Sequence, residues 1–175
     1  MKSKCQINTL GLTLLLFLML IYPLENAFSQ GRSLAKVDSQ NNAKVVLTLI
    51  SQDKPIKLTM ADIKALQQQT FFSKSPWYPG RMKITGPLIR DVLSKYKLKG
   101  EFIEALALDD YKTKIPISDV MKYDVILAHT SNDFPLTVKT KGPLWVAYPF
   151  DDNPELQTYK HYERSIWQVK TFTIK

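Results

Sequence analysis

The residues best suited to chemistry in this sequence are two pairs of adjacent acids, Asp109-Asp110 and Asp151-Asp152. An ionised carboxylate accepts two hydrogen bonds side by side, so it matches a ring N–H beside an amino group, as on the edge of a pterin or guanine. Such a ring also needs an aromatic or guanidinium plane to stack on. The candidates for that plane are Trp77, Tyr78, Tyr111, Tyr148, Arg81, Arg90 and Arg164. Adjacent acids also stabilise turns by bonding the backbone, and the pattern alone leaves both roles open.

Nucleophilic and metal-dependent chemistry have no motif in this sequence. The chain has two histidines, His129 and His161, and no Gly-x-Ser-x-Gly elbow. Two histidines cannot close a zinc site without carboxylates, and no His-Glu-x-x-His or calcium-loop spacing occurs. The single cysteine, Cys5, lies in a segment that we expect to be removed, so the mature chain is expected to have no thiolate. We therefore predict no catalytic residue and no bound metal.

The first 29 residues have the pattern of a secretory signal peptide. Lys2 and Lys4 precede an apolar run at residues 10–21, and Ala27-Phe28-Ser29 places small residues where a signal peptidase cuts. The apolar run is shorter than the about 20 residues that a membrane span needs. We expect cleavage after Ser29 and a periplasmic mature protein.

The mature chain, residues 30–175, is long enough for one core. We expect a flexible segment at residues 30–44 and one domain at residues 45–175. The formal net charge of the full chain is +8, and its lysines are scattered rather than clustered. An exported basic protein can meet anionic lipid heads or an acidic partner, and we expect no nucleic acid partner.

The periodicity predicts an α+β fold: a mixed β-sheet or partial barrel with two main helices and no regular βαβ alternation. One helix is expected to begin after Thr59, in a capping box with Asp62, and the other at Pro87. Residues 73–80 hold two prolines and a glycine and are predicted to form a loop. Strands are expected at residues 45–50, 56–58, 70–72, 102–108, 111–115, 125–128, 136–138, 144–148 and 164–174.

Residues 144–148 are apolar on both faces of an extended chain, which predicts a buried central strand that ends at Pro149. The two expected faces are Leu144, Val146 and Tyr148, and Trp145 and Ala147. We assign Trp145 and Trp167 to the core. The acids and aromatics at the carboxyl end of this strand are where a planar polar ligand could bind.

Three blocks of sequence resemble a known family. They are Pro76-Trp77-x-x-Gly80 with Ile84-x-Gly86-Pro87-Leu88-x-Arg90-Asp91-Val92-Leu93; Ala107-Leu108-Asp109-Asp110-Tyr111 with Ile115-Pro116-Ile117-x-Asp119; and Lys141-Gly142-Pro143-Leu144-Trp145 through Tyr148-Pro149, with Arg164-Ser165-Ile166-Trp167-Gln168. In order and spacing over residues 45–175, they resemble short exported members of the oxidoreductase molybdopterin-binding domain family. The resemblance implies the fold of the sulfite oxidase catalytic domain.

The resemblance also implies a molybdenum-binding cysteine, which the matching region of this chain does not have. Sulfite-oxidase enzymes hold molybdenum through a cysteine thiolate placed before the Trp-containing loop, and here that region, residues 70–75, has no cysteine. A hydroxyl is a poor replacement for a soft thiolate on this metal. The resemblance implies that pterin recognition persists, since small periplasmic relatives bind pterins and some work beside membrane-bound cyclic-dinucleotide signalling enzymes.

The leading hypothesis is a periplasmic, non-catalytic binding protein for a pterin-like ligand that signals to a membrane-bound partner. Trp77 and Tyr148 would stack on the ring, Asp110 or Asp151 would accept its paired donors, and Arg164 would bind a carbonyl. The full set of expected ligand-binding residues is Trp77, Tyr78, Asp110, Tyr111, Tyr148, Asp151 and Arg164. The alternatives are a molybdopterin-dependent oxidoreductase or a subunit of one, and a structural partner protein with no ligand.

Overall fold

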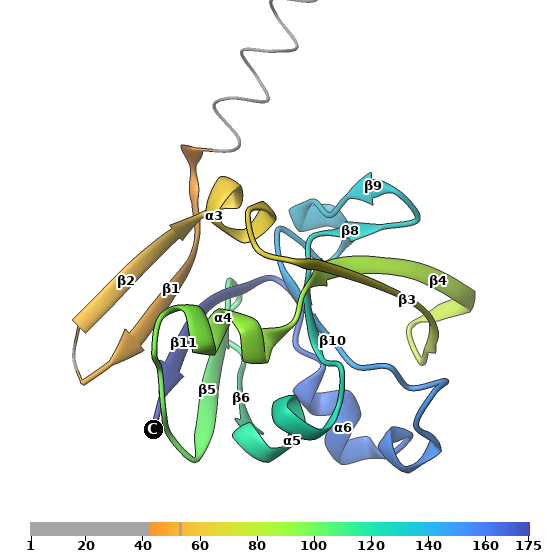
Figure 1. Ribbon diagram of the computed structural model, residues 1–175. Coiled ribbons are helices and arrows are strands. Elements are labelled where there is room, and N and C mark those ends of the chain that lie inside the picture. The colour runs from red at the N-terminus through yellow and green to blue at the C-terminus, as the bar shows by residue number, and fades with distance from the viewer. Residues whose placement is uncertain (1–42, 53) are drawn as a thin grey trace, which may run out of the picture. The chain divides into compact units, whose positions relative to one another are not determined.

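The computed structural model describes residues 43–52 and 54–175 (Figure 1). The expected signal peptide and nearly all of the expected flexible segment lie outside the described residues. The described residues fall within a single contact unit, residues 42–175. Among them, no helix has the length and apolar character needed to cross a bilayer.

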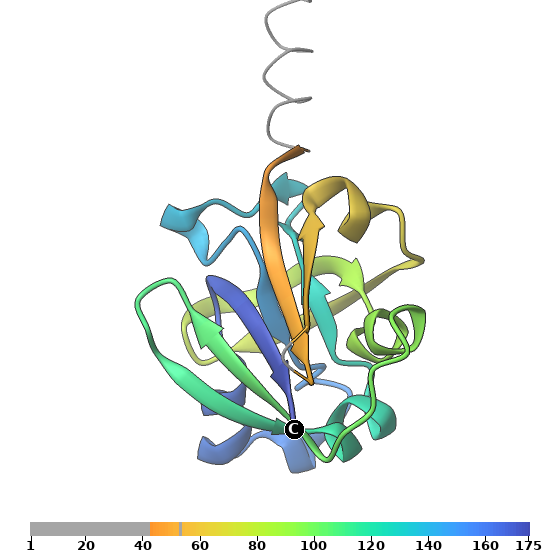
Figure 2. The ribbon, with the colours of Figure 1, turned by 90° about the vertical axis from the view of Figure 1, so that its left-hand side faces the viewer.

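A five-stranded sheet forms one side of this unit (Figure 2). Its order is β2-β1-β11-β5-β6, with β1 and β11 parallel and every other pair antiparallel. The strands are β1 (Val45–Ser51), β2 (Lys54–Thr59), β5 (Phe102–Ala107), β6 (Lys112–Pro116) and β11 (Val169–Ile174). The sheet therefore joins the first and last strands of the domain at its centre.

Two smaller sheets and several short helices complete the described fold. One sheet has the order β3-β4-β8-β9, and the other pairs β10 with β7. Their strands are β3 (Gln68–Ser75), β4 (Tyr78–Pro87), β7 (Ile126–Ala128), β8 (Thr130–Ser131), β9 (Phe134–Pro135) and β10 (Trp145–Ala147). The helices are α3 (Met60–Lys64), α4 (Ile89–Lys95), α5 (Ile117–Lys122) and α6 (Tyr159–Arg164), with 3₁₀ turns η1 (Val138–Thr140) and η2 (Pro154–Leu156). The α+β class with mixed sheets is confirmed, with four short α-helices in the described residues.

The strand β10 lies between two hydrophobic clusters, as its alternating sequence predicts. Leu144, Val146 and Tyr148 belong to the larger cluster, which covers the five-stranded sheet. Trp145 and Ala147 belong to the smaller cluster against β4 and β7. On the edge of β10 away from β7, the backbone is hydrogen-bonded to the chain that leads into β11. Val146 N donates to Ile166 O, and Val169 N donates to Leu144 O. The strand is thus buried on both faces and bonded along both edges.

Of the two main helix starts predicted from the sequence, one is confirmed. At α3, Thr59 and Asp62 form the predicted capping box, and these hydrogen bonds lower the pKa of Asp62. The prediction that Pro87 is the first residue of a helix is wrong. Pro87 ends β4, and α4 begins at Ile89, whose N–H donates to Val125 O.

Residues 73–80 are not the predicted loop. They form a tight hairpin, in which β3 runs to Ser75, Pro76-Trp77 makes the turn, and β4 begins at Tyr78. The ladder tolerates Pro79 because the register shifts at this end of the hairpin, where a missing N–H leaves no partner unpaired.

Other strand limits also differ from the sequence-based prediction, and residues 81–87, where no strand was expected, form most of β4. The strand predicted at residues 136–138 is placed earlier, at β9, because Thr137 instead caps η1. The final strand begins at Val169 rather than at residue 164, since Arg164 ends α6.

Gly86 allows β4 to pack closely on β7, which gives the first testable prediction. A methyl group there would overlap the backbone of Leu127 and Ala128. The substitution Gly86→Ala should lower the free energy of unfolding by about 2 kcal/mol or more, as overpacking a core does. Urea denaturation would measure the loss.

The matched control is Gly80→Ala in the same strand. A methyl group at Gly80 meets open space, so only its φ of +80° opposes the substitution. That strain costs about 1 kcal/mol. Equal losses for the two variants would show that β4 and β7 are not in close contact.

Candidate functional site

A cavity of about 440 Å³ lies between the β3–β4 turn, the β5–β6 turn and α6. We call it the aromatic cavity. Its aromatic lining residues are Trp77, Tyr111, Tyr159, Tyr162 and Trp167. The Trp77 ring meets the Trp167 ring edge to face, with centroids 5.2 Å apart, and the Tyr162 ring likewise at 6.1 Å. Its size and apolar walls are typical of a site for a small planar molecule.

Polar groups in the aromatic cavity come from Asp109, Glu163 and Ser165. The Tyr111 hydroxyl donates to the backbone carbonyl of Glu163 at 3.3 Å, and burial raises the pKa of the Tyr111 phenol, so it stays a donor. Asp109 Oδ1 accepts from Tyr111 N at 3.1 Å. The Glu163 carboxylate makes no hydrogen bond or ion pair with a described residue. It is therefore the acceptor most open to the donors of a ligand.

A second, more polar cavity of about 740 Å³ adjoins the first and shares Pro76 and Tyr162 with it. Asp151 lies in its lining. Its carboxylate pairs with Arg81 Nε at 2.8 Å and accepts from Lys74 N at 3.0 Å. The Asp151 carboxylate is thus already engaged by the β3–β4 hairpin.

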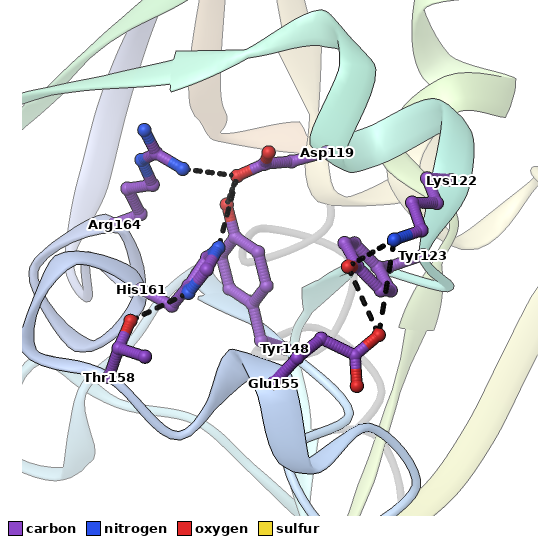
Figure 3. Close-up of polar contacts among 8 residues, drawn as sticks. All are labelled: Asp119, Lys122, Tyr123, Tyr148, Glu155, Thr158, His161 and Arg164. Atoms are coloured by element: carbon purple, nitrogen blue, oxygen red, sulfur yellow. Dashed lines mark hydrogen bonds and ion pairs between the residues drawn. The ribbon is translucent and has the colours of Figure 1, made fainter.

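A buried polar cluster centred on Asp119 joins α5 and α6 (Figure 3). Asp119 Oδ2 accepts from Arg164 Nη1 at 2.7 Å and from the Tyr148 hydroxyl at 3.1 Å. Burial raises the pKa of Tyr148 and keeps it a donor. His161 Nε2 is 4.0 Å from the same oxygen, and burial lowers the pKa of His161, so this imidazole is neutral at pH 7. The charge of Asp119 is therefore balanced by Arg164.

The Asp119 cluster determines where α6 lies, and α6 forms a wall of the aromatic cavity. Helix α6 runs from Tyr159 to Arg164, so the residues that line the cavity come just before the paired arginine. The next residue, Ser165, donates to Val146 O at 2.9 Å and accepts from Trp145 Nε1 at 3.0 Å. The wall is thus attached to α5 on one side and to β10 on the other.

Two of the predicted ligand-binding residues, Trp77 and Tyr111, lie together in the aromatic cavity. Asp151 lies in the neighbouring polar cavity, paired with Arg81. Tyr78 is exposed and lines neither of these two cavities.

The other three predicted residues lie elsewhere. Asp110 is exposed and paired with Lys170 at 2.8 Å, a contact that lowers the pKa of Asp110. Tyr148 and Arg164 are buried in the Asp119 cluster and line neither cavity. In this arrangement Tyr148 offers no free face for stacking, and Arg164 has its charge neutralised by Asp119.

The predicted set of ligand-binding residues lacked Tyr162, Glu163 and Trp167, and from the first acidic pair it took Asp110 rather than Asp109. Trp167 was assigned to the core, but it is only half buried and lines the cavity. A signal for it was present, because Trp167 belongs to one of the quoted sequence blocks. No local pattern distinguishes Asp109 from Asp110; the left-handed φ of +66° at Asp110 turns the two side chains apart.

The family model described as "Oxidoreductase molybdopterin binding domain" matches residues 35–150. The chain belongs to this family. The resemblance seen in the three sequence blocks is thereby confirmed.

Among solved structures, the chain is similar to the sulfane dehydrogenase SoxCD from Paracoccus pantotrophus, with 18% identity and a TM-score of 0.56. The match covers 73% of this chain and 37% of that chain, so this protein spans well under half of its relative's length. At this identity the likeness shows the fold alone. No match was found among curated proteins.

The donor groups present do not fit a molybdenum centre. Residues 70–75, where the family's thiolate is expected, lie in β3. Two buried hydroxyls lie there, and both have partners. Ser73 Oγ donates to Lys74 O and accepts from Asp151 N, and Ser75 Oγ accepts from Trp77 N. Within residues 43–52 and 54–175, no group of three or more His, Cys, Asp or Glu side chains is placed to hold a metal ion.

The second prediction concerns the Asp119 cluster. Asp119→Ala would leave Arg164, whose side chain is only 10% exposed, without a counter-charge. Removing one partner of a buried pair costs about 3–5 kcal/mol. We expect a loss of that size in the free energy of unfolding, measured by urea denaturation.

Asp124→Ala is the matched control. Its ion pair with Arg90 has the same 2.7 Å length, but the Asp124 side chain is 67% exposed. Its loss should stay below about 1 kcal/mol. If the two variants were destabilised alike, the Asp119 cluster would not be the buried support of α6.

Proposed function

We propose that this protein is an exported, non-catalytic binding protein for a planar heterocycle of the pterin type, which it holds in the aromatic cavity. The observation that carries this proposal is the cavity itself: five aromatic residues surround about 440 Å³ of space beside an unpaired carboxylate. Such a site matches a bicyclic ring with paired N–H donors on one edge.

Different residues of the cavity would bind different parts of the ligand. Trp77 and Tyr162 supply aromatic surface for the ring, in place of the Trp77–Tyr148 pair expected from the sequence. Glu163, with Asp109 beside it, is the acceptor for the ring N–H and amino group. The Tyr111 hydroxyl lies at the same wall and can move its proton from the Glu163 carbonyl to a ligand oxygen.

Signalling to a membrane-bound partner is the second part of the proposal, and it is supported by the export signal in the sequence and by the cavity rim. Tyr159 is 78% exposed and Tyr111 is 44% exposed, although both line the cavity. A bound ring would cover part of these side chains and change the surface that they present. A partner could read that change as occupancy.

The alternative function is that of a molybdopterin-dependent oxidoreductase or a subunit of one. The family to which the chain belongs favours it, as does the fold it shares with a dehydrogenase. The lack of a soft donor in β3 weighs against it. The third hypothesis, a structural protein with a filled pocket, is weakened by the open aromatic cavity.

The third prediction tests ligand binding. Titration of the mature protein with oxidised and reduced pterins should quench tryptophan fluorescence, because the ring would contact Trp77 and Trp167. Stacking of a base-like ring on an aromatic side chain is worth about 1–3 kcal/mol. Trp77→Ala should therefore raise the dissociation constant by about 5- to 150-fold, and Glu163→Gln should also raise it by removing one acceptor.

Phe134→Ala is the control, since Phe134 is 75% exposed and lines neither cavity. It should leave the dissociation constant unchanged. The absence of any response to either redox form of pterin would refute the proposed ligand. Equal effects of the Trp77 and Phe134 substitutions would refute the proposed site.

A further inference from the structure

Lys141 places its ammonium group among the rings of every tryptophan in the chain. Its Nζ is 3.7 Å from the ring centroid of Trp167, 4.4 Å from that of Trp77 and 5.4 Å from that of Trp145. The Tyr78 ring completes the enclosure at 4.8 Å. We call these four rings the tryptophan box.

The backbone holds Lys141 in place for this contact. Lys141 follows η1 with a φ of +75°, and its carbonyl accepts from Gln168 N at 2.9 Å. Because Gln168 is the residue after Trp167, the lysine and its nearest ring are fixed to each other through the main chain. The side chain is half buried as a result.

The ammonium group has no carboxylate to balance it. No ion pair or hydrogen bond links Lys141 Nζ to another residue in the described parts of the chain. Of the side chains in the tryptophan box, only the Tyr78 phenol can titrate. The ring faces are therefore the groups that stabilise the cation, each by about 0.5–2 kcal/mol. They act against desolvation, because burial lowers the pKa of Lys141 from its ordinary 10.5 to about 8.

The tryptophan box and the aromatic cavity share two rings, Trp77 and Trp167. Lys141 itself is not in the lining of the cavity. We propose that Lys141 is a positioning residue, whose ammonium group holds Trp77 and Trp167 in the edge-to-face arrangement that forms one wall of the aromatic cavity. The link to ligand affinity rests on the proposed function, whereas the effect on the two rings does not.

The direction of the pH dependence follows from the lowered pKa. The unfolded chain binds this proton more tightly than the folded chain, so the free energy of unfolding rises as pH increases from about 8 to about 10.5. A charged Lys141 is thus unfavourable for folding at neutral pH. Replacing Lys141 by methionine removes this cost, so stability should not fall. The order of the Trp77 and Trp167 rings should fall, because the cation that positions them is gone.

The experiment compares the wild type with Lys141→Met, Lys141→Arg and Lys139→Met, the last being an exposed lysine two residues away. Without ligand, tryptophan fluorescence of the wild type and of the Lys139 variant should change with a midpoint near pH 8. Lys141→Met should lack this transition, show a weaker near-ultraviolet circular dichroism signal, and be at least as stable as the wild type at pH 7. Lys141→Arg should keep the signal that the wild type shows below pH 8 throughout this pH range, because its guanidinium stays charged.

Isothermal titration with biopterin at pH 7 supplies the ligand readout. Lys141→Met should bind at least about tenfold more weakly, and Lys141→Arg should restore most of the affinity. A fluorescence transition that persists in Lys141→Met, or wild-type ring order and affinity in that variant, would overturn the proposal. If the wild type does not bind biopterin, the proposed function fails, and the ligand-free spectra alone decide the role of Lys141.

Discussion

The buried ion pair between Asp119 and Arg164 is the interaction on which the candidate site depends. A buried ion pair is stable only when the two charges neutralise each other and their remaining hydrogen-bonding atoms also have partners. Here the Tyr148 hydroxyl supplies the additional hydrogen bond to Asp119. Because Arg164 is the last residue of α6, fixing its guanidinium also fixes the helix that carries Tyr159, Tyr162 and Glu163. The cavity wall is thus positioned by the charge of Asp119, which is not in the lining of the cavity.

A second constraint is the burial of β10 on both faces. Its inner side chains join the core of the five-stranded sheet, and Trp145 on its other face joins the smaller cluster. Trp145 bonds Ser165 and also faces Lys141, so β10 links α6 to the tryptophan box. Within this framework, residues 70–75 supply no thiolate. The fold by itself therefore does not decide which ligand the chain binds.

The sequence predicted those parts of the fold that depend on interactions between residues close together in the chain. The alternation at residues 144–148 gave both faces of β10 correctly, and the Thr59–Asp62 spacing gave the start of α3. Residues 73–80 were misassigned because two prolines and a glycine argue against a ladder, whereas a register shift accommodates them. Helix α6 could not be predicted firmly, since its sequence is polar and its position is set by an ion pair with Asp119, 45 residues earlier.

The site was predictable only in part, for the same reason. Trp77 and Tyr111 were found because large aromatics in turns are conspicuous. Tyr162, Glu163 and Lys141 were missed, since their roles arise from contacts across the fold rather than from spacing in the sequence. The most direct measurement is native mass spectrometry of the protein purified from its native cells. We expect the mass of residues 30–175 plus one organic ligand of pterin size; a molybdenum isotope pattern, or a chain that never carries a ligand, would contradict this.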